Sequence, residues 1–226
     1  MRPYLIINAA MSADGKLSTR ERRQVRISGT EDFARVDHMR ADCDAILVGI
    51  GTVHADDPSL TVKSPILRKE RLLRGQEENP VRIVLDSRAE TPKSADILMK
   101  GKGKRIIAVT QQADPENIAQ LREYADIILC GVDRVDLHCL LKELQIRGIR
   151  KVMVEGGGTV IWSFLSQGLF DELNVYLGAV IIGGMTAPTL ADGEGFISEE
   201  QFTKLILDDV QQVDNGVLIR WRKKER

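Results

Sequence analysis

The stretch with the clearest chemical potential is Glu155-Gly156-Gly157-Gly158-Thr159, an acid and three glycines before a hydroxyl. It follows the β-branched run Val152–Val154, which predicts a buried strand, and it precedes an apolar segment with helical spacing that Thr159 could cap. Glycines at such a junction let a ligand approach the backbone, and a helix N-terminus favours an anion such as a nucleotide pyrophosphate. The spacing departs from G-x-G-x-x-G because Ile161 occupies the third glycine position, so a plain tight turn remains the alternative.

Other loops of small or polar residues follow predicted strands in the same way. The predicted strands of this part of the chain are Tyr4–Ala10, Ala45–Val48, Val81–Leu85, Lys104–Thr110, Ile127–Cys130 and Lys151–Glu155. The loops that follow them include Met11–Gly15, Gly49–Thr52, Asp86–Arg88, Gly131 and Gly156–Gly158. Ligands of open α/β sheets bind at the carboxyl ends of strands, so these loops together predict a nucleotide-sized cleft. Ser87 and Arg88 could bind an extra phosphate, such as the 2′-phosphate of NADP.

The order of elements predicts the fold class. We expect helices over Pro115–Tyr124, over Val135–Arg147, and from a Ser28 cap to about Ala41, whereas the charged Ser64–Asn79 segment is expected to be irregular. A long strand over Asp171–Ile182, an irregular loop through Gly195 and an antiparallel pair, Lys204–Val213 and Val217–Arg222, complete the chain. Asp214-Asn215-Gly216 is typical of a hairpin turn. The pattern predicts an α/β fold, with a mostly parallel central sheet, an antiparallel C-terminal hairpin and helices on both faces, in a single domain over residues 1–226.

Composition excludes several classes of function. The chain has 226 residues, of which 43% are hydrophobic and 29% charged, and its formal net charge is −1. Such values are ordinary for a globular protein, and they predict binding neither to nucleic acid nor to a membrane surface. No apolar run has the length of a membrane span, and the N-terminus lacks the pattern of a signal peptide, so we expect a cytoplasmic protein.

The residues that commonly bind metals do not form a ligand set. Cys43, Cys130 and Cys139 include no C-x-x-C pair, and an odd number of cysteines does not predict a disulfide framework. Each is expected to be a small core residue. The zinc-deaminase pattern is absent, and the pair Asp56-Asp57 has no further ligands near it in sequence, so no metal site is predicted.

Four segments resemble a known family. They are Asn8–Lys16, Arg40–Val62, Pro80–Ser87 and Glu155–Thr159, and the second contains the specific pattern Gly-Thr-Val-x-x-Asp-Asp-Pro-x-Leu-Thr-Val. Their types, order and spacing resemble the reductases of riboflavin biosynthesis, which are similar in fold to dihydrofolate reductase. The resemblance covers nearly the whole chain without a deaminase segment, as in the stand-alone archaeal or fungal form.

The resemblance implies a hydride transfer from NADPH, with NADH left open as a second donor. The substrate would be 2,5-diamino-6-ribosylamino-4(3H)-pyrimidinone 5′-phosphate, whose ribosylamino group opens to an imine and becomes ribitylamino. A solvent proton could suffice, so no side chain is assigned as the acid, and Glu155 is the catalytic candidate. A homodimer is also implied, with Asp171–Ile182 and the terminal hairpin as the candidate interface.

Site residues follow from the same resemblance. The cofactor-binding positions are Ala10, Thr52, Asp56, Ser87, Gly131, Gly156, Gly157, Gly158 and Thr159, and the substrate-binding positions are Arg40, Leu60, Lys63 and Glu155. Glu155 could accept hydrogen bonds from the pyrimidine amino groups, and Arg40 could bind the 5′-phosphate. Lys63 stands where bacterial relatives tend to have Arg, and Arg26 where they carry Trp, which leaves the local stacking open.

Two alternatives remain at this stage. The first is a pterin or folate reductase on the same fold. The second is a non-catalytic module that binds a nucleotide.

Overall fold

The structure is a computed structural model that describes residues 2–23 and 25–224. The chain divides into two compact units. The first comprises the residues up to Tyr4 together with Asp37–Met153, and the second comprises Leu5–Val36 together with Val154–Arg226. The single domain over 1–226 stays a prediction.

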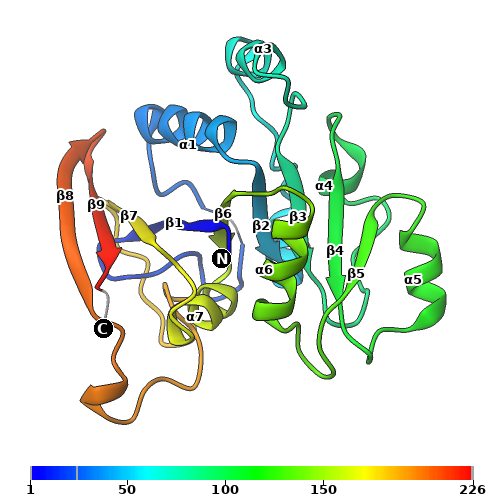
Figure 1. Cartoon of the computed structure of the whole chain (residues 1–226). Coiled ribbons are helices and arrows are strands. Elements are labelled where there is room, and N and C mark those ends of the chain that lie inside the picture. Colours follow the sequence, from blue (N-terminus) through cyan, green and yellow to red (C-terminus); the bar gives the residue numbers. More distant parts are fainter. Residues whose placement is uncertain (1, 24, 225–226) are drawn as a thin grey trace. The chain divides into compact units, whose positions relative to one another are not determined.

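The first unit contains a parallel sheet with helices between its strands (Figure 1). Its strands β2 (Ala45–Gly49), β3 (Val81–Leu85), β4 (Arg105–Val109) and β5 (Asp126–Leu129) pair in the order β5-β4-β3-β2, and Lys151–Met153 of β6 (Lys151–Gly156) follows β2. The helices are α2 (Ile50–Asp56), α3 (Pro65–Leu73), α4 (Asp96–Met99), α5 (Pro115–Leu121) and α6 (Leu137–Ile146). All five residues of β2 are buried, as expected for a strand of a parallel sheet covered on both faces.

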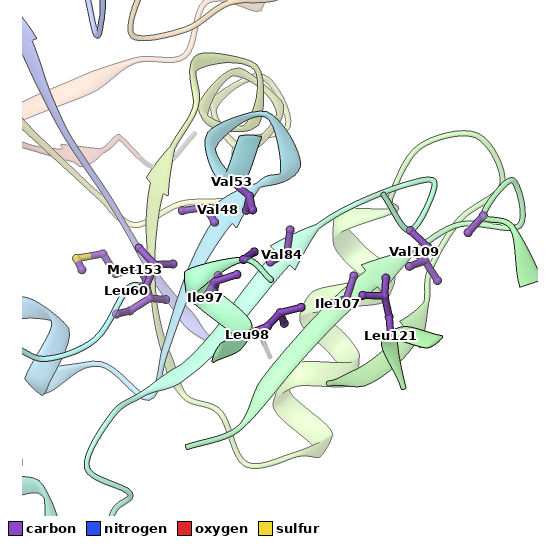
Figure 2. Close-up of a cluster of buried hydrophobic side chains, with 14 of the residues drawn as sticks. Val48, Val53, Leu60, Val84, Ile97, Leu98, Ile107, Val109, Leu121 and Met153 are labelled. Carbon is purple, nitrogen blue, oxygen red and sulfur yellow. The ribbon is translucent and has the colours of Figure 1, made fainter. Parts of the chain in front are cut away.

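One hydrophobic cluster joins these elements (Figure 2). Val48 and Val84 come from neighbouring strands, Val53 from α2, and Ile97 from α4. The short helix α4 is not among the predicted elements, although its buried Ile97 and Leu98 complete this core. Burial of apolar side chains is the main favourable term in folding, so the cluster fixes where the loops after β2 and β3 begin.

The second unit contains the C-terminal hairpin. Strand β1 (Tyr4–Ser12) pairs in parallel with β7 (Glu172–Gly178), and β7 pairs antiparallel with β9 (Gly216–Lys223). The hairpin is formed by β9 and β8 (Leu205–Val213), and α7 (Gly158–Ser166) follows β6 (Figure 1). The mixed α/β class, with mostly parallel strands and an antiparallel C-terminal pair, is confirmed.

Two predicted stretches differ from the structure. The strand expected over Asp171–Ile182 is only Glu172–Gly178, because the chain turns at Gly178, where the Val180 N–H donates to the Gly178 carbonyl at 2.8 Å. The stretch Ser64–Asn79, expected to be irregular, contains α3, because Ser64 caps the helix and Pro65 begins it.

The predicted Ser28 cap of the first long helix is wrong. Helix α1 (Thr30–Asp42) begins two residues later, and its N-terminus is capped by Asp214 of the hairpin turn. The Asp214 carboxylate accepts hydrogen bonds from the N–H groups of Glu31 (3.2 Å) and Asp32 (3.0 Å). Asp214, which is distant in sequence, therefore accepts the hydrogen bonds of the N-terminal helix N–H groups that the Ser28 hydroxyl was expected to accept.

Arg82 of β3 is a fully buried cation with backbone partners. Its guanidinium donates to the carbonyls of Lys100, Gly101 (3.2 Å) and Lys102 (3.3 Å) in the turn after α4. Burial, and then the charge of Arg105, lower the pKa of Arg82 to about 10. The Arg82 side chain thus stabilises the turn through hydrogen bonds to its backbone carbonyls.

Asp14 generates a prediction about pH. Its carboxylate accepts hydrogen bonds from Ser12 Oγ (2.6 Å), Ile182 N (3.0 Å) and Gly183 N (2.7 Å), which lower its pKa to about 2. The unfolded pKa is about 3.9, so the stabilisation is present above that pH and is lost as pH falls towards 2. We expect Asp14→Asn to lower the thermal midpoint at pH 7, and the difference from the parent to narrow between pH 5 and 3.

Asp133→Asn is the matched control, because this exposed carboxylate accepts from a side-chain amide, that of Gln112. A difference between Asp14→Asn and the parent that stays constant over the whole pH range would contradict the assignment.

Candidate functional site

The predicted site residues fall into two groups, one in each unit. In the first unit, three cofactor positions follow parallel strands of one sheet: Thr52 after β2, Ser87 after β3 and Gly131 after β5. The Ser87 carbonyl accepts from Thr110 N (3.2 Å) and Thr110 Oγ1 (2.8 Å), and Gln111 N donates to the Gly131 carbonyl at 3.2 Å. The carboxyl ends of these strands are therefore linked along one edge, where a ligand of an α/β sheet binds.

Helix α2 positions two of these residues. Strand β2 ends at Gly49 and α2 begins at Ile50 without a loop, so Thr52 is helical. Thr52 and Asp56 are four residues apart, which places them on the same face of the helix. Both are partly buried, and burial raises the pKa of Asp56.

The adjacent acid has a structural role. Asp57 is the left-handed C-cap of α2, with φ 41°, and its Oδ1 accepts from Asp96 N at 2.7 Å. Asp57 therefore ends α2 and binds the start of α4. Across the described ranges, 2–23 and 25–224, no three His, Cys, Asp or Glu side chains cluster as metal ligands.

Gly131 is required by its own loop. It has φ +99°, and an added Cβ would lie 2.2 Å from the Arg134 carbonyl oxygen and 2.9 Å from Asp136 N. Its predicted cofactor contact is not needed to explain the glycine. The role of Gly131 towards a ligand stays a prediction.

A polar cluster surrounds Lys63. The Lys63 ammonium donates to Ser59 Oγ at 2.8 Å and to Thr61 Oγ1 at 2.9 Å. The Asp37 carboxylate accepts from the backbone amides of Lys63 (2.6 Å) and Ser64 (2.8 Å), so α1 holds this segment in place. We call Arg40, Ser59, Thr61 and Lys63 the Lys63 cluster.

Arg40 adds a second positive charge. Its Nη1 donates to the Thr61 carbonyl at 3.4 Å. Burial, and then the Arg40 charge, lower the pKa of Lys63, so an anion that neutralised both cations would be favoured. Two cations beside two hydroxyls are the groups that bind a phosphate.

Leu60 has a buried side chain, unlike Ser59 and Thr61 beside it. Its side chain is 2% exposed and belongs to the hydrophobic cluster of Figure 2, and its φ is +49°. A ligand contact at Leu60 would therefore use the backbone. The predicted substrate role of this residue stays a prediction.

Sequence reasoning missed Ser59, Thr61 and Asp37. In Ser59-Leu60-Thr61-Val62-Lys63 polar and apolar residues alternate, and the two apolar members are buried. The other three side chains meet on one side of the segment, where the Lys63 ammonium donates to the Ser59 and Thr61 hydroxyls. That alternation could have identified the two hydroxyls, whereas nothing local indicates Asp37.

In the second unit, Gly156 is the last residue of β6 and the first of the glycine stretch. Gly156 has φ +122°, and the nearest atom to an added Cβ would be Ile161 Cδ1 at 3.9 Å. Gly157 is the N-cap of α7, and the peptide bond between these two glycines is cis. At Gly158, by contrast, an added Cβ would lie 2.5 Å from the Thr189 carbonyl oxygen.

The expected helix cap needs correction, whereas the cofactor role of Gly158 stays a prediction. Thr159 does not cap α7, because the helix begins at Gly158 and Thr159 is its exposed second residue. The segment after β7 covers Gly158: Asp192 N donates to its carbonyl at 3.1 Å, and Thr189 Oγ1 donates to the Asp192 carboxylate at 2.6 Å. Gly158 is thus required by packing within the chain, whereas the buried Gly156 is required by its positive φ.

The other predicted residues of this unit lie on strands and on a surface loop. Ala10 is partly buried on β1 and paired with Tyr176 of β7, and Glu155 is partly buried near the end of β6. Arg26, which replaces the Trp of bacterial relatives, is exposed and lies 5.7 Å from the centroid of the Phe33 ring. It therefore contacts an aromatic ring of its own chain.

Comparison with known proteins gives the relationships of the chain. Residues 3–219 match the family model described as "RibD C-terminal domain". The 2,5-diamino-6-ribosylamino-4(3H)-pyrimidinone 5′-phosphate reductase of Archaeoglobus fulgidus is 47% identical over 222 residues, which cover 98% of this chain and 99% of that protein.

Solved structures agree with this relationship. RibD of Acinetobacter baumannii aligns with a TM-score of 0.79 at 27% identity, over 99% of this chain and 59% of that one. Dihydrofolate reductase of Enterococcus faecalis aligns with a TM-score of 0.51 at 8% identity, over 98% of this chain and 97% of that one, and confirms the predicted fold. None of the helices in the described part of the chain has the length and apolar character that a membrane span requires. The chain belongs to the RibD C-terminal domain family.

Proposed function

We propose that this protein reduces 2,5-diamino-6-ribosylamino-4(3H)-pyrimidinone 5′-phosphate to its ribitylamino product with NADPH, as a step of riboflavin biosynthesis. The observation that carries the proposal is the end-to-end similarity, at 47% identity, to a protein named as that reductase. The geometry of both groups of residues fits the two ligands.

The Lys63 cluster suits the substrate phosphate. Lys63 and Arg40 supply positive charge, and Ser59 and Thr61 supply hydroxyl donors, in a segment held by Asp37. Lys63 acts as a compact charge, where an Arg would bind the phosphate bidentately. The Glu155 carboxylate would accept hydrogen bonds from the pyrimidine amino groups.

The cofactor positions suit a dinucleotide. The glycine backbone at Gly156 and Gly157 and the start of α7 would hold negatively charged phosphates. Thr52 and Asp56 share one face of α2, and the partly buried Asp56 can hydrogen-bond a ribose or an amide. Ser87 and Arg88 would bind the 2′-phosphate, which favours NADPH over NADH.

The chemistry of the reduction belongs mainly to the cofactor. When bound, NADPH supplies the hydride for C1′ of the substrate. The protein binds and orients the substrate through the Lys63 cluster and Glu155. Glu155 is the candidate for a proton-transfer role, and solvent is the other source of the proton.

The decisive experiment follows absorbance in the nicotinamide band with purified protein, NADPH and the ribosylaminopyrimidine phosphate. We expect a fall that requires both substrate and protein, with NADPH preferred over NADH. Dihydrofolate is assayed in parallel, and turnover of dihydrofolate alone would indicate a folate reductase. Binding of NADPH without turnover of either substrate would indicate a non-catalytic binding module.

Variants of the cofactor positions check the site assignment in the same assay. Asp56→Ala and Gly157→Val are expected to weaken NADPH affinity, and His54→Ala, an exposed position on the same helix as Asp56, serves as control. Gly157 has φ −69° and ψ −174°, values in the extended region that residues other than glycine also adopt. NADPH affinity equal to the parent's in both variants would refute this assignment.

Lys63 provides a test of the substrate site. Losing a hydrogen bond to a charged group costs about 1.5–3 kcal/mol. Lys63→Ala should therefore raise the substrate KM by roughly ten-fold or more. The KM for NADPH should stay near the parent value. Lys63→Arg should restore most of the affinity. Lys69→Ala, on the exposed side of α3, is the control. An unchanged substrate KM in Lys63→Ala would place the phosphate elsewhere.

We also propose a homodimer formed through β8. This strand ends the strand order and exposes Leu205, Ile206, Leu207 and Val210, whereas β7 is mostly buried between β1 and β9. Exposed apolar side chains on an edge strand are typical of an interface. Light scattering should give the mass of two chains for the parent and of one for Leu207→Lys. A parent that is monomeric at assay concentrations would refute this interface.

A further inference from the structure

Two of the three cysteines lie side by side. Cys130 follows β5 directly, and Cys139 lies in the first turn of α6. Their sulfur atoms are 2.7 Å apart, and both are free thiols. The expectation that each cysteine is only a small core residue does not account for this proximity.

One residue anchors both cysteines. Asp136 is the N-cap of α6, and its Oδ1 accepts from Cys139 N at 3.0 Å. The Asp136 N–H donates to the Cys130 carbonyl at 3.1 Å. A disulfide bond is about 2.05 Å long, so bonding would need only a small side-chain movement within this anchored pair.

The two thiols differ in environment. Cys139 is partly exposed and lies in the first turn of α6. Cys130 is buried, and burial together with the Cys139 neighbour raises its pKa to about 12. Cys139 is therefore the first to react with a reagent in solution.

We propose that Cys130 and Cys139 are a reversible dithiol–disulfide pair that a small-molecule disulfide oxidises, a modification site next to the predicted cofactor position Gly131. The Cys139 thiolate attacks one sulfur of the reagent, whose disulfide bond breaks to release one thiolate. Cys130 then gives its proton to solvent and attacks the Cys139 sulfur of the mixed disulfide, releasing the second thiolate. The two protein thiols lose two electrons and two protons in total, and the reagent gains them as two thiols.

The new bond would close a short segment. It would join the end of β5 to α6 and enclose Gly131, whose loop is already folded so tightly that an added Cβ would lie 2.2 Å from the Arg134 carbonyl oxygen. The reduced protein thus already holds the loop in a closed form that the disulfide would lock.

The test uses the full chain and glutathione disulfide as the reagent, with thiols counted after unfolding and the intact mass measured. We expect the parent to lose two of its three thiols, with a mass decrease of two hydrogens that dithiothreitol reverses. Cys43→Ser should lose both of its remaining thiols. Cys130→Ser should instead keep a glutathione adduct on Cys139.

Either of two results would overturn the proposal. One is a parent protein that retains all three thiols under conditions that oxidise a model dithiol peptide. The other is a parent that accumulates the adduct without forming the internal bond. Because the parent and Cys43→Ser keep both Cys130 and Cys139, a failure of Cys130→Ser to fold does not affect these readouts.

Discussion

The Lys63 segment depends on one interaction, in which the Asp37 carboxylate accepts the backbone N–H groups of Lys63 and Ser64. A carboxylate that binds amides of an irregular segment satisfies donors that no strand or helix satisfies, and such hydrogen bonds are strong because the acceptor is charged. The arrangement recurs in both units. Further carboxylates that accept backbone N–H groups from segments distant in sequence belong to Asp14, Asp44, Asp57, Asp171 and Asp214.

Much of the fold can be predicted because its signals are local. The stretch Val81–Leu85, apolar except at Arg82, predicts β3 with both of its ends, and the leucine spacing of Val135–Arg147 predicts α6 within two residues. The long-range carboxylates cannot be predicted, because an aspartate carries no sign of the amide it binds. For this reason the cap of α1 is wrongly attributed to Ser28, although Asp214 stands in a correctly predicted turn.

The site is predicted in part, and glycine shows why. A glycine motif indicates that something approaches the backbone closely, but the motif does not identify what approaches. At Gly131 and Gly158 the approaching group is another part of the same chain, whereas at Gly156 the positive φ of +122° is what requires glycine. Likewise, the Leu60 position matches the family pattern while its side chain belongs to the core. A match to a family therefore locates a site more reliably than it assigns each contact within it.

Arg82 shows what such backbone contacts mean for the evolution of the protein. Its guanidinium binds carbonyl oxygens of the turn at Lys100–Gly103 and no side chain of that turn. Mutations of the exposed side chains of the turn would leave these contacts in place. A lysine at position 82 lacks the planar guanidinium that binds several carbonyls at once. Variation between orthologues should therefore accumulate at positions 100 and 102 while arginine persists at position 82.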